Sequence, residues 1–269
     1  MDRDATGDAS RPVAIIVAME SEQVHLDRLL PGLRRHQSDI WPTWIGGAND
    51  IPLVVIECGI GMVSAAAATE HVIATWRPRA ILNYGCTGAH SRALFPGDVV
   101  IGTDLIHQGR MRFAPDGEII PLDVPFTVPG ESEPRTGLAC DPALVEAARQ
   151  ASATVDLPMW PERHRLDTQP ADRAPAVHVG PIASADVWLQ DPSRLDAMHQ
   201  RTGSLCEDME AAAIAQVATL HGVPFLAIKD ISNSEFYVAS VFDESSSALP
   251  VEEVGKRAAI LLTATLAHL

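Results

Sequence analysis

Runs of apolar, often β-branched residues recur along this chain, and several of them lead into segments whose apolar residues have helical spacing. The first run, residues 13–19 (VAIIVAM), has no polar position. A run without alternation is typical of a strand that is covered on both faces, as the strands of parallel sheets are. This feature constrains the fold most, because such a strand needs helices above and below its sheet.

Strands are predicted at residues 13–19, 52–58, 80–84, 97–106, 177–183 and 224–231, and helices at residues 20–30, 62–76, 141–151, 207–220 and about 250–266. The helix at 141–151 is the one convincing helix of its region, because Asp141 can cap it and Pro142 occupies its first position. Strands that alternate with helices predict an α/β fold with a mainly parallel sheet and helices on both faces.

Length and proline distribution predict the domain organisation. A chain of 269 residues suffices for one large domain or two small ones. Residues 107–175 carry 10 of the 20 prolines, and we interpret them as loop-rich excursions on one scaffold. Residues 1–12 are polar, so we expect a flexible leader followed by a single domain at residues 13–269.

Charge and cysteine usage exclude several classes of function. The net charge is −15, which argues against nucleic-acid and membrane partners because both present anionic surfaces. No apolar run approaches the roughly 20 residues that span a bilayer, and the first residues lack a signal-peptide pattern, so we expect a cytoplasmic protein. The 4 cysteines and 10 histidines lack metal-ligand spacing, which predicts neither a metal nor a disulfide framework.

Four polar clusters follow predicted strands, at residues 19–22, 59–61, 83–89 and 229–233. Ligands of open α/β sheets bind at the carboxyl ends of strands, so these clusters are candidates for one site. Glu20 and Glu22 open a helix, where carboxylates are also favoured by the helix dipole. Helix capping and a base acting on water are therefore both open interpretations of this pair. The glycine pair at 59–61 is more typical of a turn than of a nucleotide-binding loop.

The segment at residues 206–213 is the most informative of the chain. It places Glu207, Asp208 and Glu210 at the predicted start of a helix whose next turns are apolar. The dipole explains one or two of these carboxylates, but a carboxylate entering the interior needs donors, such as the hydroxyls of a ligand. The loop predicted at 83–89 suits a sugar or a base, whereas a nucleophilic Cys86 is disfavoured because only His90 is near it in sequence.

Taken together and in this order, six motifs resemble the nucleoside phosphorylase superfamily, and within it the methylthioadenosine/S-adenosylhomocysteine nucleosidases. The motifs are IIVAMESEQ (15–23), ECGIGMVSAAAATE (57–70), ILNYGCTGA (81–89), GDVVIG (97–102), IASADVWLQD (182–191), and CEDMEAAAIAQVA with VPFLAIKDISN (206–233). The resemblance implies a single domain with a central twisted mixed sheet flanked by helices. It also implies a homodimer or larger homo-oligomer, a purine nucleoside as substrate, and cleavage of the C1′–N9 bond without metal or organic cofactor.

The resemblance also assigns roles to residues near the sugar. Glu22 matches the carboxylate that activates the attacking water, and Met209 and Glu210 match the pair that holds the ribose. Cys86 stands where these nucleosidases carry a serine, and Lys229 stands where they carry an arginine. This chemistry suits carboxylates, because glycosidic cleavage passes through a ribose with cationic character.

At the base, Trp188 matches the aromatic residue that stacks on the purine, and Leu189 matches the neighbour whose backbone reads the base edge. The residue at position 233 departs from the pattern, because adenine-releasing members carry an aspartate there and Asn233 cannot be a general acid. Ser232 and Asn233 resemble the I-S-N of 6-oxopurine enzymes, and an amide can donate to a carbonyl and accept from a ring N–H. Adenine and a 6-oxopurine both stay open, with Asp230 as a less favoured substitute acid because strand alternation points it away from Asn233.

The second departure concerns the acceptor of the ribosyl group. Phosphorylases of the superfamily commonly carry an arginine in the loop just before the glycine that corresponds to Gly85, and residues 82–84 contain none. Water is therefore the favoured acceptor. The sequence predicts a purine nucleosidase, with a phosphate-dependent purine nucleoside phosphorylase and a non-catalytic nucleoside-binding or storage protein as alternatives.

Overall fold

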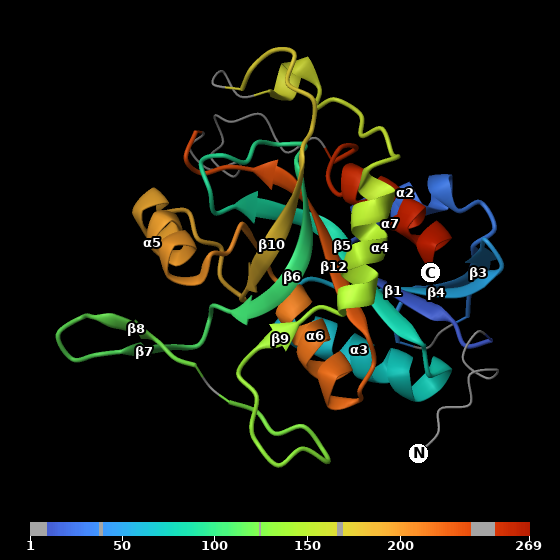
Figure 1. Ribbon diagram of the computed structural model, residues 1–269, viewed down its shortest axis with the longest axis horizontal. Coiled ribbons are helices and arrows are strands. Elements are labelled where there is room, and N and C mark those ends of the chain that lie inside the picture. Colours follow the sequence, from blue (N-terminus) through green and yellow to red (C-terminus); the bar gives the residue numbers. More distant parts are fainter. Residues whose placement is uncertain (1–9, 38–39, 124, 166–168, 238–250) are drawn as a thin grey trace.

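The computed structural model of the 269-residue chain describes residues 10–37, 40–123, 125–165, 169–237 and 251–269. They form a single α/β domain in which helices flank a twisted mixed sheet (Figure 1), as predicted. Most of the predicted leader, residues 1–9, lies outside the described residues. No helix in the described part of the chain is long and apolar enough to cross a bilayer.

The main sheet of the described residues runs in the order β11-β10-β6-β12-β5-β1-β4-β3-β2, and β9 pairs with β6. Its strands are β1 (Val13–Val17), β2 (Arg34–His36), β3 (Thr43–Ala48), β4 (Ile51–Glu57), β5 (Ala80–Ala89), β6 (Val99–His107), β9 (Leu138–Ala139), β10 (Val177–Ser184), β11 (Cys206–Asp208) and β12 (Phe225–Asn233). The strands β4, β1, β5 and β12 are mutually parallel, and β12 is antiparallel to β6. The sheet is thus mixed, not mainly parallel.

One end of this sheet closes on itself. Strand β11 pairs parallel with β10 and antiparallel with β5, so that β5, β12, β6, β10 and β11 form a closed ring of pairings. This closure brings the acidic segment that starts at Cys206 against the end of β5. A segment predicted from its own residues to begin a helix therefore becomes part of the sheet.

The helices of the described residues pack on the two faces of the sheet. They are α2 (Glu20–Leu29), α3 (Met62–Trp76), α4 (Pro142–Ser152), α5 (Pro192–Thr202), α6 (Ala211–Leu220) and α7 (Lys256–Thr265), with short 3-10 turns η1 (Glu162–His164) and η2 (Leu266–His268). Helices α3 and α6 pack together on one side, and α7 packs between α2 and α4 on the other (Figure 1). Strand β1 lies between these layers with all five residues buried, as its uninterrupted apolar run predicted.

Four predicted boundaries are wrong. The helix predicted at 207–220 begins at Ala211, because Glu207 and Asp208 belong to β11 and Glu210 occupies the N-cap position. The strands predicted to end at 84 and 231 continue to Ala89 and Asn233, so residues 83–89 form strand and not loop. The last helix begins at Lys256 and not near 250, since Gly255 has a φ of 74° there.

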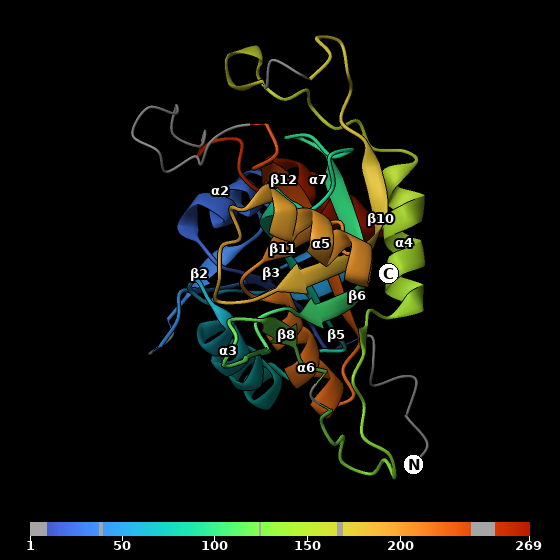
Figure 2. The ribbon, with the colours of Figure 1, turned by 90° about the vertical axis from the view of Figure 1, so that its left-hand side faces the viewer.

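The pattern analysis missed several elements. Strands β2 and β3 extend the sheet beyond β4, and α5 begins at Pro192 with Asp191 as its cap. Within the region predicted to be loop-rich, β7 (Met111–Phe113) and β8 (Ile119–Pro121) form a hairpin that projects from the body (Figure 1). Figure 2 shows this hairpin and α5 on the same side of the molecule.

Candidate active site

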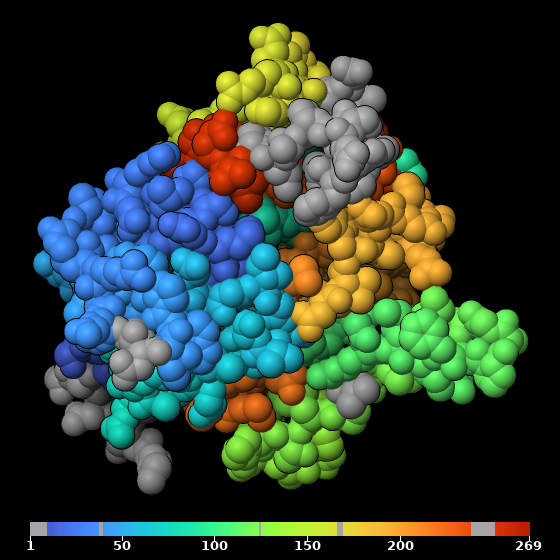
Figure 3. Space-filling view, turned by 180° about the vertical axis from the view of Figure 1, so that it is seen from behind, coloured from blue at the N-terminus to red at the C-terminus, as the bar shows by residue number. Residues whose placement is uncertain are grey.

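The four predicted polar clusters meet at one cavity. Figure 3 shows this face of the molecule hollowed where segments from the first and last thirds of the chain meet. The cavity has a volume of about 220 Å³. Its lining comprises Ala18, Met19, Glu22, Ile60, Cys86, Thr87, Gly88, Val187, Trp188, Glu207, Asp208, Met209, Glu210, Ser232 and Asn233. Most of the site residues predicted from the sequence are therefore brought together.

Glu22 lies in the first turn of α2, directly after β1, and its carboxylate turns back toward the strand end. Its Oε2 accepts hydrogen bonds from the backbone N–H groups of Ala18 (3.1 Å) and Met19 (3.3 Å), and its Oε1 accepts from that of Cys86 (2.8 Å). The side chain is only 2% exposed. Two of these donors lie at the start of α2, where Glu22 forms a capping box with Met19. Capping does not account for the third bond, from Cys86, or for the place of the carboxylate at the cavity wall.

Gly85 makes this position possible. A Cβ atom built on Gly85 would lie 2.5 Å from Oε1 of Glu22, which is closer than non-bonded atoms approach. Tyr84, buried beside it, donates its hydroxyl to the backbone oxygen of Glu22 at 2.7 Å. The motif at 81–89 thus leaves space for the Glu22 carboxylate and fixes the Glu22 backbone.

Burial raises the pKa of Glu22, and the positive charge of Lys229 and the backbone donors partly oppose that rise. Burial also raises the pKa of Glu210, to about 7, and the charge of Asp208 adds to the effect. Both carboxyls are therefore shifted toward neutral pH, where a carboxylate can take up and return a proton.

Glu210 reaches the cavity from the N-cap position of α6. Its Oε1 accepts a hydrogen bond from the backbone N–H of Gly61 at 2.8 Å, although the two residues are 149 positions apart. Gly61 has a φ of 103°, and a Cβ there would lie 3.0 Å from Oδ1 of Asp186. The glycine turn after β4 thus supplies a backbone donor to a catalytic candidate.

Lys229 is buried beneath the cavity and does not line it. Its Nζ lies 2.7 Å from Oδ2 of Asp208. Burial lowers the pKa of Lys229, but Asp208, Glu210 and Glu22 more than offset this and hold the pKa above its ordinary value. We call Glu22, Asp208, Glu210 and Lys229 the cavity cluster; it places three carboxylates around one ammonium.

Cys86 and Met209 line the cavity together with Glu22 and Glu210. Burial and the charge of Glu22 raise the pKa of the Cys86 thiol well above its ordinary value, so the thiolate form is strongly disfavoured. This agrees with the prediction that Cys86 is not a nucleophile.

The opposite end of the cavity carries Trp188, Ser232 and Asn233. The Asn233 amide donates from Nδ2 to Oε1 of Glu235 at 3.1 Å, and its Oδ1 accepts from the Ser232 hydroxyl at 2.9 Å. Leu189, predicted to read the base edge, follows Trp188 but does not line this cavity; its backbone N–H donates to Oε1 of Glu207 at 2.9 Å.

Glu207 and Asn233 lie on either side of Gly88. In the sheet register, Gly88 of β5 pairs with Glu207 of β11 and with Asn233 of β12. A Cβ on Gly88 would lie 3.3 Å from Nδ2 of Asn233 and 3.7 Å from Cγ of Glu207. Because directly paired residues point to the same face of a sheet, the two polar side chains flank the gap that the glycine leaves.

Asp230, the less favoured substitute acid, lies away from the cavity. Its Oδ2 accepts from the backbone N–H of Arg257 at 2.8 Å on the side of α7. The argument from strand alternation did not include the shift in register between Ile231 and Asn233. The Asp230 side chain nevertheless points away from the cavity that Asn233 lines, as that argument predicted.

Sequence reasoning named Glu207 and Asp208 only as possible helix-capping or ligand-binding acids, and it gave no role to Tyr84 and His90. These residues acquire their places through long-range pairing; His90, for example, lies 3.1 Å from Oε2 of Glu207, 117 positions away. The available signal was their polarity within otherwise apolar segments.

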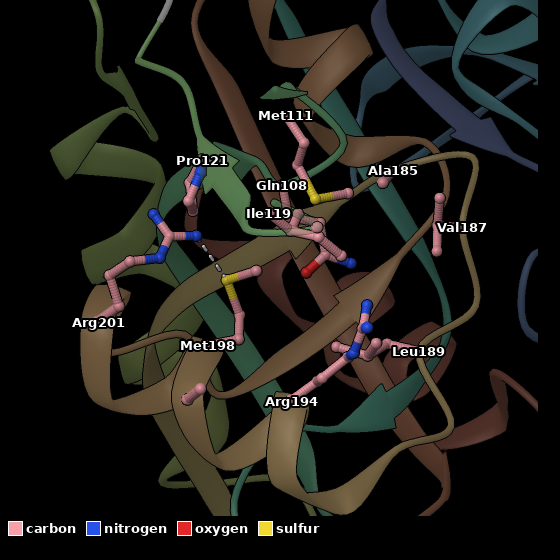
Figure 4. Close-up of a pocket in the computed structure, with 12 residues that line it drawn as sticks. Gln108, Met111, Ile119, Pro121, Ala185, Val187, Leu189, Arg194, Met198 and Arg201 are labelled. Carbon is pink, nitrogen blue, oxygen red and sulfur yellow. Dashed lines mark hydrogen bonds between the residues drawn. The ribbon is translucent and has the colours of Figure 1, made fainter. Parts of the chain in front are cut away.

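A second cavity, of about 490 Å³, opens between the β7–β8 hairpin and α5 (Figure 4). Met111, Ile119 and Pro121 line it from the hairpin side, and Arg194 and Arg201 line it from α5. It shares Val187 with the first cavity. The second cavity is mostly apolar, and none of the described residues that line it carries a carboxylate.

The sequence is similar to a known protein family and to named members of it. A sequence model described as the phosphorylase superfamily matches residues 12–267. The chain is 32% identical over 222 residues to a 5′-methylthioadenosine/S-adenosylhomocysteine nucleosidase of Geobacillus kaustophilus, covering 82% of this chain and 83% of that protein. It is also 28% identical to the nucleosidase of that name from Chromohalobacter salexigens, covering 92% of this chain and 97% of that protein.

Solved structures agree with the fold. The structure is similar to that of a 5′-methylthioadenosine/S-adenosylhomocysteine nucleosidase from Neisseria meningitidis in complex with methylthio-immucillin-A. The TM-score is 0.73 at 25% identity, covering 96% of this chain and all of that one. A futalosine hydrolase of Helicobacter pylori has the same fold, with a TM-score of 0.73 at 17% identity over 97% of this chain and 99% of that one.

Proposed function

Because the chain belongs to the phosphorylase superfamily, we propose that it is a purine nucleosidase, an N-glycosidase that hydrolyses the C1′–N9 bond of a purine nucleoside. The names of its relatives support a nucleoside of the 5′-methylthioadenosine or S-adenosylhomocysteine type. The reaction needs a water, a base for it, and negative charge facing the ribose, and none of these requires a metal or an organic cofactor.

The observation that carries the proposal is the fixed, buried carboxylate of Glu22. Three backbone donors hold it at the cavity wall, and burial raises its pKa. In the proposed reaction the C1′–N9 bond breaks and the water oxygen bonds to C1′ while Glu22 accepts a proton from that water. The purine leaves as an anion and takes its proton from solvent. The adjacent Cys86 lines the water and ribose side of the cavity, and Gly85 leaves room for the carboxylate.

Charge in the cavity cluster supports cleavage through a cationic ribose. The three carboxylates around Lys229 leave surplus negative charge next to the cavity, and preorganised negative charge stabilises a transition state that becomes positive. Glu210 accepts hydrogen bonds from ribose hydroxyls in this proposal, with Met209 packed against the sugar. Lys229 keeps Asp208 in place beneath them.

The base binds at the other end of the cavity. Trp188 stacks on the purine ring. Leu189, the next residue, lies behind this end of the cavity and donates its backbone N–H to Glu207. Asn233 contacts the purine, with Ser232 holding its amide through the bond at 2.9 Å. An asparagine cannot protonate the leaving base, so this end leaves two classes of purine to be distinguished, adenine and 6-oxopurines.

Hydrolysis is favoured over phosphorolysis by the cavity lining. Phosphate is usually bound by arginine, with bidentate hydrogen bonds. Among the described residues that line the cavity there is no arginine or lysine. A phosphate-dependent phosphorylase is therefore the second candidate. A non-catalytic nucleoside binder is the third, and the buried, pKa-shifted Glu22 and Glu210 argue against it, because storage needs neither.

The test is purine release from methylthioadenosine, S-adenosylhomocysteine, adenosine, inosine, guanosine and futalosine, each with and without phosphate. We expect free purine and free ribose derivative without phosphate. Release that depends on phosphate, with a ribose 1-phosphate product, would establish the phosphorylase instead. Saturable purine binding without release from any substrate would establish the binder.

We also propose a homo-oligomer in the cytoplasm. Exposed apolar side chains next to the cavity mouth and at the hairpin tip, Ile60, Val63 and Phe113, support an oligomer. The four cysteines are all free, as expected in a reducing compartment. Light scattering of the purified protein tests the oligomer, which a monomeric mass at micromolar concentration would contradict.

A further inference from the structure

Glu207 is a second buried carboxylate of the cavity, at the end opposite Glu22. Its side chain is 7% exposed and belongs to the cavity lining. Its Oε1 accepts the hydrogen bond from the backbone N–H of Leu189 at 2.9 Å. Its Oε2 accepts from Nε2 of Gln108 at 2.6 Å and lies 3.1 Å from Nε2 of His90. A carboxylate offers about four acceptor positions, so one, on Oε1, stays free.

This arrangement places a hydrogen-bond acceptor at the base edge, where the resemblance predicts a donor. The resemblance assigned the backbone of Leu189 to base recognition, and its free N–H would donate to a ring nitrogen with a lone pair. In this structure Glu207 takes up that N–H. The edge therefore presents a carboxylate acceptor where a donor was expected, and an acceptor pairs with a ring N–H and not with a lone pair.

The orientation of Asn233 gives an independent indication. Its Nδ2 donates to Oε1 of Glu235 at 3.1 Å. An ionised carboxylate only accepts hydrogen bonds, so this contact fixes which end of the amide is NH₂. Ser232 occupies Oδ1, and Nδ2 is the atom of the amide nearest to the gap over Gly88. The second N–H of Nδ2 is thus available as a donor to the cavity.

We propose that Glu207 is a specificity-determining residue of the proposed nucleosidase, selecting nucleosides of 6-oxopurines over those of adenine by accepting the N–H at ring position 1. This inference rests on the proposed function and names its substrate class. A 6-oxopurine carries a donor at N1 and acceptors at O6 and N7. The N1 donor matches the carboxylate of Glu207, and the O6 and N7 acceptors match the amide donor of Asn233 on the other side of Gly88.

Adenine mismatches both groups. Its N1 has a lone pair that faces the Glu207 carboxylate, and its 6-amino group faces the Asn233 N–H. A site built around specific hydrogen bonds rejects an analogue that leaves its buried groups unpaired. Rejection requires that Glu207 cannot simply turn away, and three contacts hold it.

Two of these contacts come from outside the cavity. Gln108 reaches Glu207 from the cavity under the β7–β8 hairpin, where Figure 4 shows it among the lining residues. His90 is fully buried, and its Nδ1 lies 2.9 Å from the Ser204 hydroxyl, which keeps its Nε2 directed at Glu207. Leu189, Gln108 and His90 therefore hold the Glu207 carboxylate in place.

The experiment measures kcat/KM for 5′-methylthioinosine and 5′-methylthioadenosine, which share a 5′ group and differ at the base edge. Wild type is compared with Glu207→Gln and with Glu146→Gln, an exposed charge-matched control on α4. We expect wild type and the control to prefer the inosine analogue by about 10²-fold or more. In Glu207→Gln the ratio should fall at least about tenfold, because a neutral amide replaces the carboxylate that accepts the N–H at N1.

A wild-type preference for the adenosine analogue would overturn the inference, and so would an unchanged ratio in Glu207→Gln. Calorimetric binding of free hypoxanthine and adenine to wild type needs no variant to fold, and hypoxanthine must bind more tightly. If neither nucleoside is cleaved while hypoxanthine is still preferred, the nucleosidase proposal fails and the assignment of Glu207 to base recognition stands. If both nucleosides are cleaved with equal kcat/KM, the nucleosidase proposal stands and the assignment of Glu207 to base recognition fails.

Discussion

Adjacent residues of β12, Lys229 and Asp230, point to opposite faces of the strand and enter two different buried ionic clusters. Lys229 belongs to the cavity cluster. Asp230 belongs to a cluster that we call the α7 cluster, formed by Asp230, Glu253 and Arg257. The Arg257 guanidinium is fully buried and lies 3.9 Å from Oδ2 of Asp230 and 2.9 Å from Oε2 of Glu253.

The two clusters differ in their charge balance and in their access to a cavity. In the α7 cluster, Arg257 also donates to the backbone oxygens of Pro158 (2.7 Å) and Met159 (2.8 Å), and Lys256 balances Glu253 at 3.0 Å. In the cavity cluster, three carboxylates share one ammonium, and all three, Glu22, Asp208 and Glu210, line the open cavity. The charges of the α7 cluster are balanced once Lys256 is included, and none of its residues lines the cavity, although Oδ1 of Asp230 and Nη1 of Arg257 lack a hydrogen-bond partner among the described residues. The cavity cluster has negative charge left for a ligand.

Burial of charge alone does not identify an active site. Burial raises the pKa of Asp230 to about 7, as it does that of Glu210. Only the second carboxyl faces a cavity. Perturbed pKa values therefore point to function only together with an opening through which a ligand reaches the group.

The largest effect is expected from Glu22→Gln, which removes the proposed base from the cavity cluster. Turnover should fall about 10⁴-fold, equivalent to about 5.4 kcal/mol of transition-state stabilisation. The measurement is kcat for purine release by folded protein, with circular dichroism to verify the fold. Turnover within tenfold of wild type would remove Glu22 from the mechanism.

Arg257→Met tests the closed cluster, where the effect should be on stability. The substitution leaves the buried carboxylate of Asp230 without its counter-charge, so the free energy of unfolding should fall by about 3–5 kcal/mol. Urea denaturation measures it. Lys256→Met, on the neighbouring partly exposed lysine, is the matched control and should change stability far less. Equal losses in both variants would contradict a central role of Arg257.

Gly85→Ala tests how tightly the cavity cluster is positioned. The new Cβ would lie 2.5 Å from Oε1 of Glu22, so the carboxylate must shift away from its backbone donors. A displacement of about 1 Å at a reacting group costs about 10²-fold in kcat. Gly137→Ala, where no atom lies within 4 Å of an added Cβ, is the control and should keep full activity. Full activity of Gly85→Ala would show that Glu22 tolerates displacement.

The smallest effect is the pH dependence of kcat/KM. Burial, followed by the charge of Asp208, raises the pKa of Glu210 to about 7. Its ionised form accepts from the ribose, so protonation removes activity as the pH falls through that value. Below it, kcat/KM should fall about tenfold per pH unit. A profile that is flat between about pH 6 and pH 8 would show that neither raised carboxyl must ionise in the free enzyme.

The fold followed from the sequence wherever local pattern suffices. The buried run of β1 and the helix after it were predicted because a strand covered on both faces must be apolar throughout. The helix start at Ala211 was not predicted. Whether Glu207 and Asp208 extend a helix or form β11 depends on pairing with β5 and β10, which lie far away in the chain.

For the site, local pattern predicts which residue types gather at the strand ends, since Glu22, Glu210 and Asn233 follow apolar strands or open an apolar helix. The groups that these residues contact depend on tertiary structure. The N–H of Gly61 on Glu210 and the carboxylate of Glu207 on the N–H of Leu189 arise from the closure of the sheet. Local periodicity records the burial of each segment, whereas hydrogen-bond partners depend on how distant segments pair.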